Sequence, residues 1–380
     1  MIIKNVKIID AKKNTHGDVL IKDGLIKEVC NTNFSENEEI IDGTGYVLMP
    51  SFIDFHCHLR DPGFEYKEDM ESGMIAALKG GYTHLVAMAN TKPIIDNAKL
   101  LEDNYSKSDK LNLCDLTQIC ALTKKFESEL VDFENLLKYT PVFSNDGLTI
   151  ENDEIMIKAL KASEELNFYI ATHCQPETST VRRDMELLKN TKGNIHVCHV
   201  SKEDTVSLIR EAKKNGYNVT CEVTPHHIFE SEIKYRVNPP FRKESDRLAL
   251  IKSIKEGIID ICATDHAPHS QEDKNKGMPG IGNIEVAFSM YWHIFSKYNI
   301  HINKLSEMMS YTPAKLLGLN CGLIEPGYEA NLVLIDLEKI GVLDVNSFVS
   351  KSKNNPFHNY SIKGEVIITI KRGEIKYDNR

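Results

Sequence analysis

Short runs of apolar residues alternate with longer amphipathic segments over most of this chain. Eight such runs lie between residues 49 and 326, and helix-like segments separate most of them. In one of these segments Val206, Ile209 and Ala212 recur at helical spacing, with charged residues between them. Eight strands that alternate with helices predict a (β/α)8 TIM barrel. The alternative is an open doubly wound sheet, but no glycine-rich phosphate fingerprint follows an early strand. The eight runs are PSFIDFHCHL, THLVAMAN, NLCDLTQICAL, PVFSND, FYIATHC, IHVCHV, NVTCEV and DICATDH.

The two ends of the chain show a different pattern. Residues 1–48 consist of short strand-like runs separated by polar turns, and residues 327–380 contain ANLVLIDL and GEVIITIKRGEIKY. Both ends are therefore expected to form one small β-sandwich domain. The catalytic barrel domain is expected to span residues 49–326.

Composition restricts the classes of partner. The net charge of −9 argues against binding nucleic acid through its phosphates, which requires a basic surface. No apolar stretch is long enough to span a membrane, and the first residues lack the pattern of a secretory signal. The nine cysteines form no CxxC pair, which is typical of buried free thiols in a reducing compartment. We therefore expect a cytoplasmic protein.

Five of the eight runs end in residue types that bind metals. The carboxyl ends of barrel strands meet at the catalytic face, so these side chains are expected to converge there. Strand side chains alternate between two faces, which turns Cys57, Cys174 and Cys198 away from the ligands beside them. We interpret those cysteines as packing residues. The expected ligands are His56, His58, Asp146, His173, His199 and Asp265.

Four imidazoles and two carboxylates suit zinc or a similar divalent ion. Six ligands are too many for one catalytic ion with an open position, whereas two ions that share a bridging group use them all. Three other histidines, His84, His196 and His301, lack such a pattern and are expected to be structural. His226 and His227 follow a strand end and could lie near the site.

The segments around the expected ligands resemble those of the dihydroorotases in the amidohydrolase superfamily. They are HCHLRDPGFEYKED, MANTKP, SNDG, HC, CHVS, VNPPFR and TDHAPH, and the resemblance covers nearly the whole chain. HxHxRDPG together with NPPxR and TDHAPH is far more specific than HxH alone. The chain departs from the family in MANT for MPNT, SNDG for DDG and HCQPE for HCED, and in a short segment between His173 and His199. MANT keeps Asn90, the short segment concerns the wall around the second metal and an oligomer contact, and no departure removes a ligand.

The resemblance implies two Zn²⁺ ions per subunit, bridged by Asp146 and a hydroxide. His56, His58 and Asp265 would complete one metal site, and His173 with His199 the other. Asp265 would also act as general base and pass a proton to the leaving amide nitrogen. Arg60 lies two residues beyond His58 on the same face, where a guanidinium can bind a carboxylate through two hydrogen bonds; a rim salt bridge is the alternative. The expected substrate contacts are Arg60, Asn90, Asn238 and His269.

The implied reaction is the reversible cyclisation of N-carbamoyl-L-aspartate to L-dihydroorotate in pyrimidine synthesis. A hydantoinase or allantoinase would share the metals but take neutral rings, and Arg60 with Asn90 and NPPxR favours a ring that carries a carboxylate. A non-catalytic assembly partner would have lost metal ligands, and a mononuclear deaminase would not use Asp146 as a bridge. The family further suggests a homodimer and a possible association with aspartate transcarbamoylase. Residues 270–284 are expected to form a loop that moves over the substrate.

Overall fold

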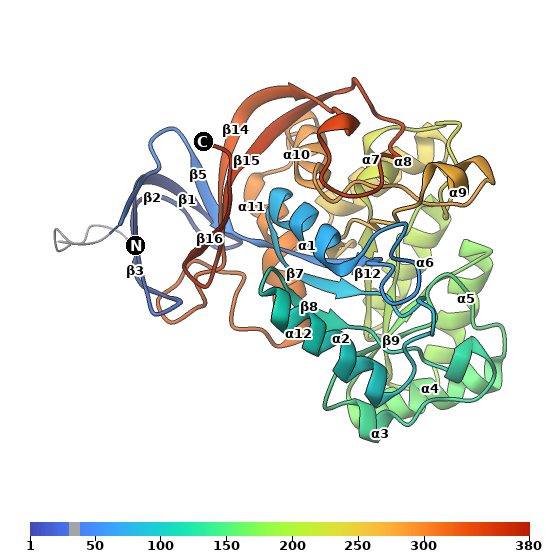
Figure 1. Ribbon diagram of the computed structural model, residues 1–380. Coiled ribbons are helices and arrows are strands. Elements are labelled where there is room, and N and C mark those ends of the chain that lie inside the picture. Colours follow the sequence, from blue (N-terminus) through green and yellow to red (C-terminus); the bar gives the residue numbers. More distant parts are fainter. Residues whose placement is uncertain (30–38) are drawn as a thin grey trace.

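A parallel barrel forms the centre of the computed structural model, which describes residues 1–29 and 39–380 (Figure 1). Each barrel strand coincides with one of the eight apolar runs, although β7 and β11 begin one residue earlier than their runs, so the predicted TIM barrel is confirmed. Neighbouring strands pair in parallel in chain order, within two hydrogen-bonded sheets. The strands are β6 (Phe52–Cys57), β7 (Tyr82–Ala87), β8 (Asp115–Gln118), β9 (Val142–Ser144), β10 (Tyr169–Thr172), β11 (Asn194–Val197), β12 (Val219–Val223) and β13 (Ile261–Cys262).

Two short bridges join these sheets and close the barrel. Between β8 and β9, the amide of Ser144 donates to the carbonyl of Cys120 at 2.9 Å. Between β13 and β6, the amide of His58 donates to the carbonyl of His266 at 2.9 Å. The second bridge places the first and last predicted metal-binding runs side by side.

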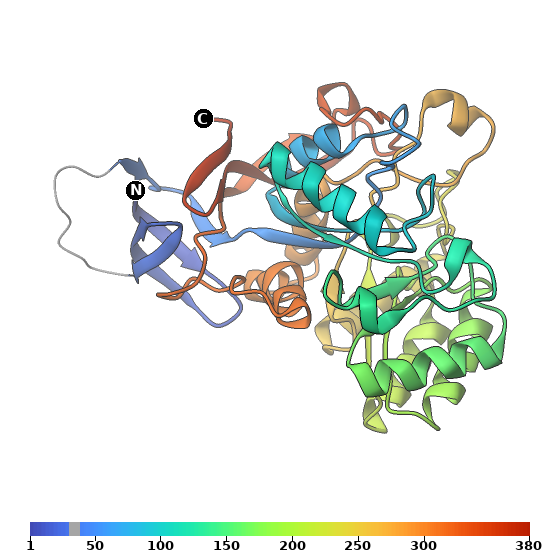
Figure 2. The same cartoon turned by 60° about the horizontal axis from the view of Figure 1, so that its bottom comes forward.

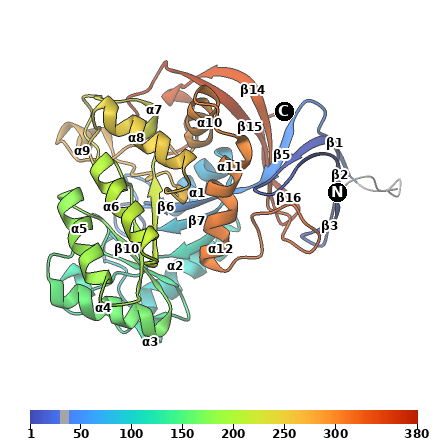
Figure 3. The same cartoon turned by 180° about the vertical axis from the view of Figure 1, so that it is seen from behind.

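Helices surround the barrel, as the views from two opposite sides show (Figures 1 and 3). Helix α6 buries Val206, Ile209 and Ala212, the three residues that the sequence pattern placed on its inner face. The helices are α1 (Met70–Lys79), α2 (Ala98–Leu111), α3 (Phe133–Leu136), α4 (Asp153–Leu166), α5 (Glu177–Leu188), α6 (Glu203–Lys214), α7 (Pro225–Phe229), α8 (Glu244–Lys255), α9 (Gln271–Asn275), α10 (Ala287–Lys297), α11 (Ile302–Ser306) and α12 (Thr312–Leu317). No helix in the described part of the chain has the length and apolar character that a membrane crossing requires.

Both ends of the chain contribute to one continuous sheet beside the barrel (Figure 2). The sheet curls so that the turns near its two ends meet at Ala330. The amide of Ala330 donates to the carbonyl of Gly24, in one of these turns, at 2.8 Å, and the amide of Gly373, in the other turn, donates to the carbonyl of Ala330 at 3.1 Å. The expected sandwich is thus built from one curled sheet around its own apolar core. Its order is β16-β15-β14-β5-β1-β2-β3 with β4 beside β1, and the strands are β1 (Ile2–Ile9), β2 (Asn14–Lys22), β3 (Leu25–Val29), β4 (Ile40–Asp42), β5 (Val47–Pro50), β14 (Leu332–Val342), β15 (Ser361–Lys371) and β16 (Glu374–Asp378).

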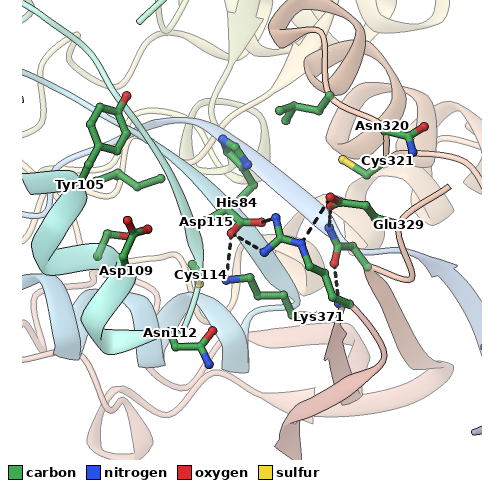
Figure 4. A pocket seen from close by; sticks show the side chains of 15 residues that line it. His84, Tyr105, Asp109, Asn112, Cys114, Asp115, Asn320, Cys321, Glu329 and Lys371 are labelled. Carbon is green, nitrogen blue, oxygen red and sulfur yellow. Dashed lines mark hydrogen bonds and ion pairs between the residues drawn. The ribbon is translucent and has the colours of Figure 1, made fainter. Parts of the chain in front are cut away.

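Ion pairs connect this sheet to the amino-terminal end of the barrel. Asp115, the first residue of β8, lies 2.9 Å from Lys371 and 3.0 Å from Arg372, and Arg372 also pairs with Glu329 at 3.3 Å (Figure 4). These groups line a cavity of about 350 Å³. In a TIM barrel this end carries stability and the opposite end carries catalysis.

The connection between β14 and β15 leaves the sheet and packs on the barrel. In this segment, residues 343–360, the side-chain amide of Asn354 donates to the carbonyl of His269, and that of Asn355 donates to Gly282 at 2.9 Å. The terminal part of the chain therefore supports the loop after β13. The division into domains at 49–326 stays a prediction.

Candidate metal centre and substrate pocket

Six side chains of metal-binding types meet at the carboxyl end of the barrel. Each lies at or just beyond the end of a strand, and all six are buried. The convergence predicted from the strand ends is therefore present in the structure, although the role of each residue stays a prediction. The residues are His56, His58, Asp146, His173, His199 and Asp265.

Asp146 lies at the centre of this group. Its Oδ1 atom is 3.6 Å from Nε2 of His56 and 3.4 Å from Nδ1 of His173. The same oxygen is 3.5 Å from Nε2 of His199, and Oδ2 is 3.5 Å from Nε2 of His58. A carboxylate with histidines of both expected sites around it has the position that a bridging ligand requires.

Asp265 supplies the second carboxylate. Its Oδ1 atom lies 3.2 Å from Nε2 of His58 and 3.6 Å from Nε2 of His56. The potential ligand atoms of these three residues all lie within 4.8 Å of one another. They form the same trio that the sequence analysis assigned to the first ion.

The second trio differs from the expected one in a single member. The potential ligand atoms of His56, Asp146 and His199 lie within 4.8 Å of one another, so His56 occurs here too. The expected member, His173, is adjacent, because its Nδ1 atom is 2.9 Å from Nε2 of His199. The residues expected to hold the second ion therefore lie side by side, and their role as ligands stays a prediction.

Two atoms of the group are buried with no hydrogen-bond partner among the described residues, namely His56 Nε2 and Asp146 Oδ1. Leaving a buried polar atom without a partner costs about 1–3 kcal/mol, so such atoms call for an explanation. Imidazole nitrogens and carboxylate oxygens are ligands that zinc and similar ions prefer. The residues therefore fit a divalent cation, which would satisfy both atoms.

The electrostatics of the group favour ionised carboxylates. Burial acts to raise the pKa of Asp146, but the charge of His56 and the nearby imidazoles of His173 and His199, 3.4 and 3.5 Å from its Oδ1 atom, outweigh it and hold the pKa well below its ordinary value. Burial is likewise outweighed at Asp265, where His58 and His56 lower the pKa. The pKa of His56 is raised well above its ordinary value, since Glu222 and Asp146 outweigh its burial. This cluster therefore attracts positive charge, as a cation site does.

Glu222 in β12 is a member of the site that the sequence analysis missed. It is fully buried, and its Oε1 atom lies 2.6 Å from Nδ1 of His56 and accepts from the amide of His199 at 3.1 Å. Its Oε2 atom lies 3.1 Å from Nε2 of His196. Burial would raise the pKa of Glu222, but His56 and these hydrogen bonds lower it to about 2. The sequence feature that could have indicated this residue is the single acidic position inside the apolar run NVTCEV.

Three residues of the site have a left-handed backbone. The φ angle is 60° at Arg60, 35° at His199 and 46° at Asp265. Side chains other than glycine adopt this region at a cost of roughly 1–3 kcal/mol, and such residues cluster at functional sites. The strain is therefore consistent with selection for side-chain placement at this end of the barrel.

A pocket of about 280 Å³ opens at this group, and Arg60 forms part of its wall. The guanidinium lies 3.3 Å from Nε2 of His269 and donates to the carbonyl of Pro268 at 3.1 Å. Burial lowers the pKa of Arg60 to about 10, which leaves it charged at neutral pH. Among the described residues no carboxylate lies within ion-pair distance of it, so the rim salt bridge considered as an alternative is absent. A buried cation without an ionic partner is poised to receive an anion.

Asn90 and Asn238 both line the pocket, but they also contact the expected metal ligands. The Oδ1 atom of Asn90 lies 2.9 Å from Nδ1 of His58. The side-chain amide of Asn238 lies 3.1 Å from Nε2 of His173 and donates to Gln175 at 2.9 Å. Each asparagine is therefore positioned to orient an imidazole as well as to meet a substrate.

The cysteines and the remaining histidines agree largely with their predicted structural roles. The eight described cysteines are buried free thiols, and Cys30 lies outside the described residues. Cys198 is closer to the site than expected, because its sulfur lies within 4.8 Å of ligand atoms of His56 and Glu222. His226 and His227 both contact the hydroxyl of Thr224 and are not among the six expected ligands. His84 contacts Thr117 and His301 contacts Asn303, whereas His196 contacts Thr220 and also Glu222, the buried carboxylate of the site.

The loop expected to move over the substrate carries the short helix α9. Met278, Pro279 and Gly280 from this loop line the pocket. Lys274 holds the loop in its present shape by donating to the carbonyls of Arg236, Met278 and Gly280 at 2.9, 3.0 and 2.7 Å. Closure of the loop over a ligand stays a prediction.

Comparisons with known proteins show the family of the chain. The sequence pattern of the amidohydrolase family matches residues 47–376. A dihydroorotase of Clostridium botulinum (strain Eklund 17B / Type B) is 43% identical over 394 residues, which cover 99% of each chain. A dihydroorotase of Aquifex aeolicus (strain VF5) is 36% identical over 417 residues, again with 99% of each chain covered.

Solved structures with the same fold include hydantoinases. The L-hydantoinase (dihydropyrimidinase) from Arthrobacter aurescens superposes with a TM-score of 0.91 at 22% identity, over 99% of this chain and 96% of that one. The D-hydantoinase (dihydropyrimidinase) from Thermus sp. gives a TM-score of 0.85 at 23% identity, over 98% and 94%. At these identities the likeness concerns the fold alone.

Proposed function

The chain belongs to the dihydroorotases of the amidohydrolase family, and we propose that two zinc ions at the six-residue group support its reaction, the reversible cyclisation of N-carbamoyl-L-aspartate to L-dihydroorotate. His56, His58 and Asp265 would hold one ion. His173 and His199 would hold the other, and Asp146 would contact both. The family and the group of potential ligands support a divalent metal; zinc and the number of ions belong to the proposal.

The guanidinium of Arg60 is buried and has no carboxylate within ion-pair distance among the described residues. This observation favours a substrate that carries a carboxylate. Dihydroorotate is a cyclic amide with a carboxylate, whereas hydantoin and allantoin have no carboxylate. Arg60 and His269 face each other at 3.3 Å on the wall of the pocket, and the expected metal ligands lie in the same pocket. A carboxylate bound there would hold the ring with its amide towards the two aspartates, so binding and orientation come from one contact.

The chain's own residues determine how protons move. Bound divalent ions would polarise the ring carbonyl and lower the pKa of a water molecule. The pKa of Asp265 is lowered and its side chain lines the pocket, so we propose that its carboxylate accepts a proton from the attacking water. As the ring carbon–nitrogen bond breaks, Asp265 returns that proton to the leaving nitrogen. His58, 3.2 Å from Asp265, fixes the orientation of its carboxylate.

Hydrolysis of L-dihydroorotate by zinc-replete protein, beside hydantoin and allantoin, tests the proposal directly. We expect turnover of dihydroorotate alone, loss of turnover with a chelator, and two zinc ions per chain by elemental analysis. Turnover of only the neutral rings would contradict the role of Arg60. One bound ion at full activity would contradict the bridged pair.

The quaternary structure belongs to the proposal as well. We propose a homodimer and, with aspartate transcarbamoylase, a larger complex, on the basis of the family resemblance. Sedimentation velocity of the pure protein and of the mixture tests both. A monomer at enzyme concentrations that give full activity would contradict the dimer, and independent sedimentation of the two enzymes would contradict the complex.

A further inference from the structure

Lys67 is a buried cation in the wall of the substrate pocket to which the proposed reaction assigns no task. Only 7% of its surface is exposed. Its ammonium group lies 3.3 Å from Nδ1 of His269 and 3.4 Å from Asp273 in helix α9. The rings of Phe64 and Tyr66 lie 5.1 and 5.5 Å from the same nitrogen, so the side chain is held in place on several sides.

His269 lies between two cationic side chains, and Oδ2 of Asp273 lies 3.8 Å from its Nδ1 atom, beyond hydrogen-bond distance. Arg60 faces its Nε2 atom and Lys67 faces its Nδ1 atom, both at 3.3 Å. Burial and these two charges lower the pKa of His269 to about 3, so its ring is neutral at physiological pH. A neutral imidazole has one N–H donor and one lone pair.

The hydrogen-bond donors around His269 restrict which of its ring nitrogens carries the proton when a carboxylate binds. Guanidinium and ammonium groups only donate, so a neutral His269 can accept from one of them at a time. A carboxylate placed beside Arg60 and Nε2 of His269 accepts a hydrogen bond from both, which requires the proton on Nε2. The lone pair is then on Nδ1, where Lys67 can donate to it.

We propose that Lys67 is a positioning residue for substrate binding: by donating to Nδ1 of His269, it fixes the tautomer whose Nε2–H binds the substrate carboxylate. This inference rests on the proposed function, because the anion it concerns is the carboxylate of dihydroorotate or carbamoyl-aspartate. Lys67 also adds positive charge behind His269, which favours a substrate that carries a carboxylate over a neutral ring. Its ion pair with Asp273 links the same contact to the loop that borders the pocket.

Replacing Lys67 by methionine keeps most of the side-chain volume and removes the donor. A hydrogen bond to a charged group contributes about 1.5–3 kcal/mol, so we expect KM for L-dihydroorotate to rise about 10- to 100-fold, with a much smaller change in kcat. Lys67→Arg restores a cationic donor and should recover KM to within a few-fold. Lys99→Met is the matched control, because Lys99 is exposed, pairs with Asp103 in helix α2 and does not line the pocket, so the change should leave KM unchanged.

A spectroscopic measurement reports the tautomer directly. In protein labelled with ¹⁵N-histidine, the His269 signals are identified by their loss in His269→Asn, and orotate serves as a probe with the same ring carboxylate. With orotate bound, we expect a protonated Nε2 and an unprotonated Nδ1 in the unaltered protein, and mixed tautomers in Lys67→Met and Lys67→Leu, neither of which has a donor. Identical shifts in all three proteins, or an unchanged KM in Lys67→Met, would overturn the inference. Failure of the unaltered protein to turn over dihydroorotate would instead contradict the proposed function.

Discussion

The Nδ1 atom of His56 lies 2.6 Å from Oε1 of Glu222, a residue 166 positions away in the sequence. This contact turns Nε2 of His56 towards Asp146 and Asp265. A carboxylate on the far nitrogen of a metal-binding histidine fixes its tautomer and increases its basicity as a ligand. Glu222 also holds the amide of His199, so one buried carboxylate supports two expected ligands.

Glu222→Gln should weaken zinc binding by about 10- to 100-fold, because a neutral amide supports His56 less strongly than a carboxylate does. Competition with a chromophoric chelator measures the affinity, and the thermal transition of the variant checks that the barrel is folded. Glu211→Gln, an exposed glutamate of helix α6, is the control and should bind zinc normally. Equal affinities for both variants would mean that the contact with His56 does not support metal binding.

Asp265→Asn should retain its metal but lose activity. The amide preserves the shape of the side chain and can still contact His58, but it cannot accept the proton from water. General base catalysis contributes about 10²- to 10⁴-fold, and we expect kcat to fall at least that far. Zinc content and kcat are measured on the same preparation, so that loss of metal is not mistaken for loss of the base. Near-normal turnover would remove Asp265 from the proton pathway.

Arg60→Met should mainly weaken substrate binding. Loss of the charge-assisted hydrogen bonds to a carboxylate corresponds to a rise in KM of about 10- to 100-fold, whereas the proton-transfer residues remain in place. Steady-state kinetics with L-dihydroorotate separate KM from kcat. An unchanged KM would show that the carboxylate is bound elsewhere in the pocket.

His84 should make the stability of the protein sensitive to mild acid. Burial lowers its pKa from 6.5 to about 4, and its Nε2 atom lies 2.7 Å from the hydroxyl of Thr117. Between pH 6.5 and 4 the unfolded chain binds a proton at this residue that the folded chain does not bind, so stability falls as the pH falls. The contribution lost at pH 5 is about 2 kcal/mol.

Denaturant unfolding of metal-free protein from pH 8 to pH 5, compared with His84→Gln, measures this contribution. The unaltered protein should lose more stability on acidification than the variant, because the variant has no imidazole to protonate when it unfolds. Other titrating groups affect both proteins equally. Parallel curves for the two proteins would show that His84 is protonated in the folded state.

Much of the catalytic face could be predicted from the sequence because its signals are local. Apolar runs of strand length define the eight barrel strands, and the alternation of side chains within a run decides that His56 and His58 share a face. Once the fold is a barrel, residues at the carboxyl ends of strands converge whatever their separation along the chain. The six expected ligands therefore follow from strand ends and residue types, without knowledge of which strands are neighbours.

The tertiary structure alone decided which side chains support these residues. Glu222, Lys67 and the segment 343–360 reach the site through contacts across the barrel or between distant parts of the chain, and no local pattern names their partners. The curled sheet likewise depends on pairing between the two ends of the chain. The sequence by itself determined the strands and the chemical groups at their ends, because hydrophobic periodicity and strand alternation are properties of neighbouring residues. Packing decided the orientation and charge of those groups, because both depend on partners that only the folded chain brings within hydrogen-bond distance.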